Sequence, residues 1–129
     1  MVEQGKPRFG LIGFGEVGTA LGTGLTAQGL PVIAYDSGYQ TPPFGELIQR
    51  RAREAGVTLA GSIAEVVAGS DLILAMVPGG AALPAATDAA KALRAGQTYA
   101  DMGTATPPAK EQMARLVEAT GASFVDVAI

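Results

Sequence analysis

Short apolar runs alternate with helix-like stretches along the chain, and this alternation strongly limits how the chain can fold. The runs that we predict as strands are Arg8–Gly13, Pro31–Asp36, Val57–Ala60, Asp71–Val77, Gln97–Met102 and Ser123–Ile129. Strands that are separated by helices pair in parallel, because each right-handed crossover returns the chain to the same edge of the sheet. We therefore predict an α/β fold with a doubly wound, mostly parallel sheet of about six strands and helices on both faces.

The segments between these runs carry helical periodicity. The predicted helices are Glu16–Gln28, about Phe44–Ala55, a short one from Ser62 through Ala68, one around Pro84 and one that starts at Pro107 and Pro108. Four of these helices have an apolar face that we expect to point inward. The residues of this face are Val17, Ala20, Leu21 and Leu25 in the first helix, and Phe44, Leu47, Ile48, Ala52 and Ala55 in the second. They are Leu83, Ala86, Ala90 and Leu93 in the fourth helix, and Ala109, Met113, Leu116 and Val117 in the fifth. The glycines expected to end helices are Gly29, Gly56 and Gly121. Ser62 and Glu65 have the spacing of a capping box, and Pro84 is expected in a first turn, where proline is tolerated.

Composition excludes several kinds of chemistry. The 129 residues suffice for one domain with its own core, and they include neither cysteine nor histidine. Disulfides, thiolate zinc sites and imidazole general bases are therefore excluded, and we predict no metal site. The net charge of −3 with scattered signs argues against a nucleic-acid partner. Because no apolar run has the length of a membrane span or signal peptide, we expect a cytoplasmic protein without a membrane partner.

Three glycines with the spacing G-x-G-x-x-G follow the first predicted strand and open the first predicted helix. In a dinucleotide site, Gly13 allows the tight turn, Gly15 lets the backbone approach a pyrophosphate, and Gly18 lets helix and strand pack closely. The helix N-terminus adds free N–H groups and the positive end of a dipole. The residues of this loop that we predict to bind a dinucleotide are Gly13, Phe14, Gly15, Glu16, Val17 and Gly18. The sheet and the loop together predict a Rossmann-type fold, although the loop could also be a simple tight turn.

Asp36 stands at the end of the second predicted strand, where this kind of site has an acidic residue. Its carboxylate can accept hydrogen bonds from ribose hydroxyls and would repel a 2′-phosphate, which favours NAD over NADP. The alternative is that Asp36 accepts local backbone hydrogen bonds in the turn Asp-Ser-Gly. Arg50, Arg51 and Arg53 follow nearby in the sequence and leave NADP open.

Four segments together resemble the N-terminal NAD(P)-binding domain of the β-hydroxyacid dehydrogenases, a family that includes 6-phosphogluconate and 3-hydroxyisobutyrate dehydrogenases. They are FGLIGFGEVGTALGTGL, DLILAMVPGG, YADMGTATPP and FVDVAI, and the resemblance covers essentially the whole chain. The second strand with its aspartate, and FVDVAI, look most similar to the 6-phosphogluconate-dehydrogenase-like members. The resemblance implies that 1–129 is a dinucleotide-binding domain.

The resemblance also implies further cofactor contacts. Val77 and Pro78 would line the cofactor, and Thr104 would approach its nicotinamide end. The alternatives are that Pro78 ends a strand and that Thr104 is a turn residue or a cap before Pro107. Asp101 interrupts an apolar strand, and we expect it to accept hydrogen bonds from neighbouring backbone N–H groups.

Hydride transfer at a hydroxyl carbon needs a group that moves the hydroxyl proton. The resemblance implies a lysine on a helix after the sixth strand, which would come beyond Ile129. We expect Lys91 and Lys110 to be solvated surface charges, and we assign no catalytic residue. The chain is thus expected to be the cofactor-binding part of a longer dehydrogenase for a small hydroxy acid. The family's all-helical domain, which supplies substrate and homodimer contacts, is absent from it. Alone, the chain should bind NAD weakly without turnover.

Two other functions share the glycine loop. One is that of an imine or pyrroline-carboxylate reductase fragment, against which the segment DMGTATPP argues. The other is a non-catalytic NAD-sensing module coupled to a partner.

Overall fold

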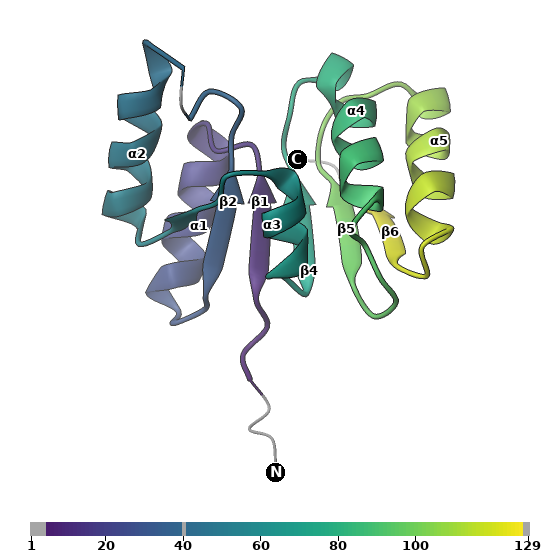
Figure 1. The fold of residues 1–129 in the computed structure, drawn as a ribbon, viewed down its shortest axis with the longest axis horizontal. Helices are drawn as coiled ribbons and strands as arrows, with labels where there is room; N and C mark the ends of the chain where they lie inside the picture. The colour runs from purple at the N-terminus through teal and green to yellow at the C-terminus, as the bar shows by residue number, and fades with distance from the viewer. Residues whose placement is uncertain (1–4, 40, 128–129) are drawn as a thin grey trace.

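The six predicted strands form one sheet, and the predicted fold class is confirmed (Figure 1). The computed structural model describes residues 5–39 and 41–127. Its strands are β1 (Phe9–Ile12), β2 (Val32–Tyr35), β3 (Thr58–Leu59), β4 (Leu72–Ala75), β5 (Thr98–Asp101) and β6 (Ser123–Asp126). Its helices are α1 (Glu16–Ala27), α2 (Phe44–Ala55), α3 (Ile63–Ala68), α4 (Gly79–Ala90) and α5 (Pro107–Glu118). The last two residues of the predicted sixth strand, 128 and 129, lie outside the described residues.

The strands are all parallel and lie in the order β3-β2-β1-β4-β5-β6. In chain order, β2 and β3 therefore extend the sheet on one side of β1. The chain then crosses over, and β4, β5 and β6 extend the sheet on the other side. Ile12 at the end of β1 pairs with Tyr35 on one side and with Ala75 on the other. Beyond β4, Asp101 pairs with both Ala75 and Asp126. This register brings the residues that follow the strands to one edge of the sheet, at the top in Figure 1.

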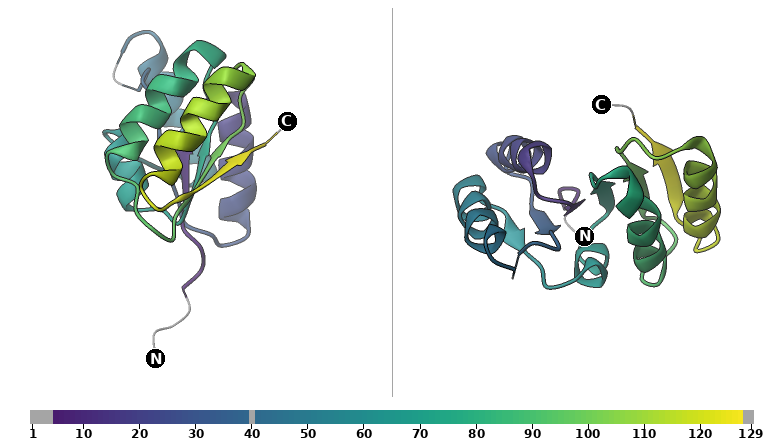
Figure 2. Two further views of the ribbon diagram at one scale, coloured as in Figure 1. Left: turned by 90° about the vertical axis from the view of Figure 1, so that its right-hand side faces the viewer. Right: turned by 90° about the horizontal axis from the view of Figure 1, so that it is seen from above.

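Helices cover both faces of the sheet. Seen from above in Figure 2, α1 lies on one side of the sheet and α3 and α4 lie on the other. Leu11 and Ile12 are neighbours in β1, and they belong to different buried clusters because successive strand residues point to opposite faces. The cluster with Leu11 includes residues of α2, and the cluster with Ile12 includes residues of α3, α4 and α5.

Helix α1 packs through glycines, which confirms the close packing predicted for Gly18, whereas the inward positions predicted for Val17 and Ala20 are wrong. Its buried residues are Gly18 and Gly22, whereas Val17 is 43% exposed, Ala20 is exposed, and Leu21 and Leu25 are only partly buried. A Cβ on Gly18 would lie 2.5 Å from the carbonyl oxygen of Gly13. One on Gly22 would lie 2.8 Å from Val57 Cγ2. The helix backbone itself makes the contact, which a search for apolar side chains does not detect.

In α2 the predicted bounds are confirmed, and one inward residue is wrong. Ile48, Ala52 and Ala55 are buried, and Leu47 is partly buried. Phe44 is 60% exposed, because the buried position in the first turn belongs to Gly45.

Helix α4 begins at Gly79, earlier than expected, so Pro84 lies in its second turn and its predicted place in the first turn is wrong. Without an N–H, Pro84 leaves the Gly80 carbonyl without its usual helical donor. The buried face consists of Ala82, Ala85, Ala86 and Ala89. Of the predicted stripe, Ala86 is confirmed, Leu83 and Ala90 are half-buried, and Leu93 is buried beyond the helix. Glycine is a poor helix former, which is why the sequence pattern placed the start too late.

The remaining helix-end predictions are confirmed. In the capping box, Ser62 Oγ accepts the Glu65 N–H, and the Glu65 carboxylate accepts the Gly61 N–H. Helix α5 opens with two prolines and buries Met113 and Val117, with Ala109 and Leu116 partly buried. The expected end glycines, Gly29, Gly56 and Gly121, have positive φ. Within the described ranges, no helix combines the length and apolar character needed to cross a lipid bilayer.

We predict opposite effects of the same substitution at two positions of α1. Around Gly24 a Cβ would meet nothing within 4 Å, so Gly24→Ala should raise the free energy of unfolding by about 0.5–1 kcal/mol. Gly18→Ala should lower it by about 1–3 kcal/mol, because the methyl group collides with the Gly13 carbonyl. Urea denaturation of both variants measures the difference, and equal stabilities would contradict the backbone contact.

Candidate functional site

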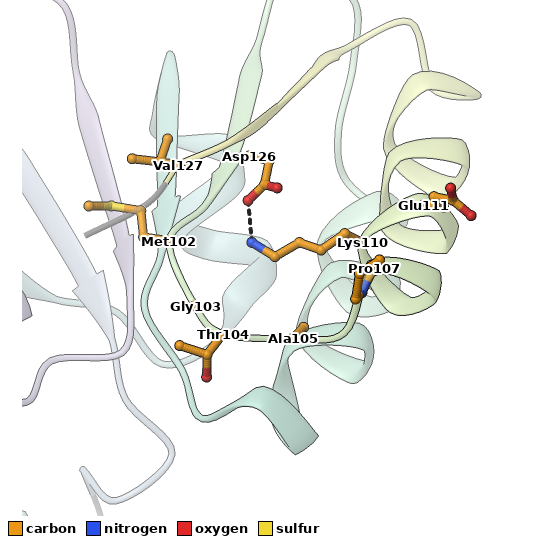
Figure 3. Close-up of a pocket in the computed structure, with 9 residues that line it drawn as sticks. All are labelled: Met102, Gly103, Thr104, Ala105, Pro107, Lys110, Glu111, Asp126 and Val127. Atoms are coloured by element: carbon orange, nitrogen blue, oxygen red, sulfur yellow. Dashed lines mark hydrogen bonds and ion pairs between the residues drawn. The ribbon is translucent and has the colours of Figure 1, made fainter.

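Three neighbouring cavities lie along the sheet edge where the strands end. The β2-side cavity, of about 430 Å³, includes Asp36 in its lining. The central cavity, of about 290 Å³, shares Gly15 and Val77 with it. The β6-side cavity, of about 540 Å³, shares Gly103 and Thr104 with the central one (Figure 3). The three cavities together form an extended groove at the point where the chain changes direction across the sheet, which is where ligands bind in open α/β sheets.

The glycine loop forms the wall of this groove next to α1. Gly13 has φ +96°, and a Cβ on it would lie 2.3 Å from the Met76 carbonyl oxygen, so only glycine allows the turn this close to β4. Around Gly15 a Cβ would meet nothing within 4 Å, and this open side faces two of the cavities. Gly15 is also the N-cap of α1, and within the described residues no side chain caps this helix. The first-turn N–H groups and the positive end of the dipole are therefore available to an anion such as a pyrophosphate.

The other loop residues contribute unequally. Glu16 and Val17 are exposed and line the central cavity, as does Gly18. Phe14 is fully buried in the core, and its backbone N–H donates to Asp36 Oδ2 at 2.8 Å. The Phe14 side chain therefore supports the loop from beneath and does not line the groove.

Asp36 joins the glycine loop to the turn that follows β2. One carboxylate oxygen accepts the Phe14 N–H, and the other accepts the Gly38 N–H at 2.8 Å, so the expected local turn is present. Each carboxylate oxygen has a second lone pair, which leaves Asp36 able to accept hydroxyl hydrogen bonds from the groove. Asp88 of α4, which nothing in the sequence singled out, also lines this cavity. None of the described lining residues is a lysine or an arginine.

The site residues predicted from the resemblance lie along the same groove. Val77 and Pro78 line the β2-side cavity, and Pro78 is the N-cap of α4. Thr104 is exposed between the central and β6-side cavities. It is not the cap of α5, because Thr106 Oγ1 accepts the Ala109 N–H there. All ten predicted residues except Phe14 thus line the groove, and their contact with a cofactor stays a prediction.

Lys110 is not a solvated surface charge, so this prediction is wrong. Its side chain is 12% exposed, and its ammonium contacts Asp101 Oδ2 at 2.7 Å and the Asp126 carboxylate. Burial by itself would lower the pKa of Lys110, but hydrogen bonds and charge from the two aspartates outweigh it and raise that pKa. Lys91 does fit the prediction, since its side chain is 74% exposed and pairs with Asp88 one turn earlier. A charged residue in a buried strand, Asp101, was the sequence signal that a partner cation must be near.

Asp101 itself is fully buried at the end of β5. Its Oδ2 accepts the Gly103 N–H at 3.3 Å, which confirms the expected backbone contact, and the ion pair with Lys110 adds to it. Burial and the charge of Asp101 raise the pKa of Tyr99. Among residues 5–39 and 41–127, no three carboxylate side chains are grouped to hold a metal ion.

Comparison with known proteins gives a consistent result. Residues 8–129 match the family model described as the NAD binding domain of 6-phosphogluconate dehydrogenase. The mitochondrial 3-hydroxyisobutyrate dehydrogenase of Mus musculus is 30% identical over 128 residues, which cover 96% of this chain and 36% of the mouse protein. The chain thus spans little more than a third of the length of this relative.

Solved structures share the fold. A conserved hypothetical protein from Sinorhizobium meliloti 1021 superposes with a TM-score of 0.89 at 28% identity, over 98% of this chain and 42% of its own. The 3-hydroxyisobutyrate dehydrogenase of Mycobacterium tuberculosis, solved with L-serine, gives 0.81 at 24% identity, over 95% and 40%. An imine reductase from Myxococcus stipitatus in complex with NADP+ gives 0.78 at 19% identity, over 95% and 41%. These last two likenesses concern the fold alone.

We predict that Gly15→Val removes dinucleotide binding without unfolding the chain. The new side chain would enter the open space at the N-terminus of α1 and block a pyrophosphate from the N–H groups. Titration calorimetry should show NAD affinity reduced by about a hundredfold, or about 2.8 kcal/mol. Gly24→Val is the matched control, because it adds the same side chain to an open position further along α1 and should leave the affinity unchanged. Unchanged affinity in Gly15→Val would contradict this role of the loop.

Proposed function

Since this chain belongs to the family of the NAD binding domain of 6-phosphogluconate dehydrogenase, we propose that residues 1–129 are the dinucleotide-binding domain of a dehydrogenase. The observation that carries the proposal is the N-terminus of α1, which has no side-chain cap among the described residues and lies at the groove. Beside it, a Cβ on Gly15 would meet nothing within 4 Å. We further propose that the enzyme acts on a small hydroxy acid, which the likeness to the mouse 3-hydroxyisobutyrate dehydrogenase supports.

Each predicted residue has a physical task in this proposal. Gly13 and Gly15 keep the backbone bare, so that the α1 N-terminus stabilises the negative charge of the pyrophosphate. The Asp36 carboxylate accepts hydrogen bonds from the ribose hydroxyls of the adenosine half. Val77 and Pro78 exclude water from the middle of the groove, and Thr104 faces the nicotinamide half. The nicotinamide, when bound, supplies the carbon that accepts or donates hydride.

We propose NAD as the preferred cofactor and NADP as the less favoured one. Asp36 lines the β2-side cavity together with Asp88, which is paired with Lys91, so a 2′-phosphate placed there would meet mainly the negative charge of Asp36. The three arginines that left NADP open in the sequence belong to α2 and are not among the residues that line this cavity. The preference therefore rests on charge repulsion as much as on hydrogen bonds to the ribose.

We propose that this chain alone binds cofactor without turnover. A hydroxyl substrate needs a group that exchanges a proton near the reacting carbon. Lys110 is the lysine closest to the predicted nicotinamide half, and its ammonium is held by two aspartates that raise its pKa. A protonated, paired lysine is a poor proton acceptor. Substrate contacts, the proton-transfer group and homodimer contacts would come from the all-helical domain of the full-length enzyme.

We predict that Asp36→Asn narrows the preference for NAD over NADP by about tenfold, because it removes one full charge from the cavity. The amide keeps a similar shape but has one oxygen acceptor, so either the Phe14 N–H or the Gly38 N–H loses its acceptor, and the ratio of the two affinities is therefore the informative quantity. Affinities for the two cofactors, measured side by side by calorimetry, give the ratio. Arg51→Ala is a suitable control, and a ratio that moves there but not in Asp36→Asn would reverse the assignment.

A second prediction concerns turnover. The chain mixed with NAD and 3-hydroxyisobutyrate or 6-phosphogluconate should produce no NADH, as followed by its absorbance. The same preparation should increase the fluorescence of added NADH, which shows that the cofactor groove is intact. Production of NADH would contradict the proposal that the proton-transfer group lies elsewhere.

A further inference from the structure

The β5–α5 loop, residues 102–106, lies between the central and the β6-side cavities, in the part of the groove away from Asp36. Met102, Gly103 and Thr104 of this loop line both the central and the β6-side cavities (Figure 3). The position of the loop therefore sets the shape of the part of the groove that would receive the nicotinamide.

Lys110 connects the three elements around this loop. It lies in α5, directly after the loop, and its side chain extends towards the end of β6, as Figure 3 shows. Its ammonium contacts Asp101 Oδ2 at 2.7 Å, the Asp101 carbonyl oxygen at 3.4 Å and the Asp126 carboxylate. Asp101 ends β5 and Asp126 ends β6, so one ammonium holds both strand ends against the first turns of α5.

The charge of Asp101 makes this contact essential for the local structure. Asp101 is fully buried, and its Oδ1 has no hydrogen-bond partner among the described residues. A buried carboxylate needs a partner cation, and Lys110 is in direct contact with it. The other oxygen, Oδ2, also accepts the Gly103 N–H at 3.3 Å. Lys110 thus fixes the carboxylate that in turn fixes the loop.

The loop has little freedom on its other side. A Cβ on Gly103 would lie 3.0 Å from the Val77 carbonyl oxygen, so the loop backbone packs closely on the end of β4. Movement of Asp101 would therefore change the distance between Gly103 and Val77, two residues that line the central cavity.

We propose that Lys110 is a positioning residue, which neutralises Asp101 and Asp126 and thereby holds the β5–α5 loop in the conformation that receives the nicotinamide half of the cofactor. This inference rests on the proposed function. According to this proposal, Lys110 affects one part of the groove only, because Asp36 and the residues that would receive the adenosine half line a different cavity.

The test compares two ligands on the 129-residue chain. ADP-ribose carries the adenosine, both phosphates and the second ribose but no nicotinamide, whereas NADH carries the whole dinucleotide. Lys110→Met should weaken the affinity for NADH by about tenfold and change the affinity for ADP-ribose by less than about twofold. The reason is that only the nicotinamide half of the cofactor depends on the loop. The fluorescence gain of bound NADH should fall as well.

Matched variants separate positioning from general stability. Lys6→Met removes an exposed lysine that precedes β1, at the opposite edge of the sheet, and should change neither affinity. Lys110→Arg keeps the charge and should recover most of the NADH affinity. If Lys110→Met does not fold, Lys110→Met combined with Asp101→Asn removes the unpaired buried charge. The ammonium contacts with the ends of β5 and β6 are still lost in this double variant, so it should again weaken the affinity for NADH and not that for ADP-ribose.

Each other outcome contradicts a defined statement. A parallel loss of NADH and ADP-ribose affinity would mean that Lys110 only stabilises the fold. Unchanged NADH affinity and fluorescence in folded Lys110→Met would remove the positioning role and leave the proposed function intact. An unaltered chain that binds neither ligand would overturn the proposed function itself.

Discussion

The parallel register of the sheet is the constraint on which the rest of this structure depends. Ile12 of β1 pairs with Tyr35 of β2 on one side and with Ala75 of β4 on the other. Ala75 and Asp101 continue the same register to β6. As a result, the residues directly after β1, β2, β4, β5 and β6 all lie at one edge of the sheet. A shift of one residue in any pair would move a loop by about 3.3 Å and turn its side chains to the other face. The strand pairing therefore determines where the groove lies, and the side chains of the loops determine what lines it.

The two ends of the groove differ in how they use charge. Near β2 the carboxylate of Asp36 is held by backbone N–H groups and stays accessible to the cavity. Near β6 the buried charge of Asp101 is compensated by Lys110, so that it serves the architecture of a loop. A carboxylate that is held but accessible can recognise a ligand, whereas one that is fully buried and paired mainly determines local conformation. This contrast distinguishes the predicted binding residues from the predicted positioning residue.

Membership of the family accounts for the groove, and the reaction that we propose would need groups from outside residues 8–129. The family model covers residues 8–129, and the mouse relative extends far beyond the matched region. The features that would hold a dinucleotide are made of backbone geometry, namely bare glycines and a free helix end, and such features are shared by many enzymes of different specificity. The Lys110 contacts are of another kind, because they depend on three particular side chains.

The sequence by itself determined the order and type of the secondary-structure elements, the parallel sheet, the glycine turn and the position of Asp36 at a strand end. These follow from local signals: alternating apolar runs, glycines at turns and helix ends, and a capping pair. Only the tertiary structure decided that Val17 and Ala20 of α1 are exposed, that Phe44 stays exposed and that Lys110 is enclosed by two aspartates. A helical pattern shows which side chains are apolar but not how closely a backbone approaches its neighbour, and the burial of a charge depends on partners that are distant in the chain. For that physical reason the candidate groove could be predicted from the sequence, while the contacts that shape its far end could not.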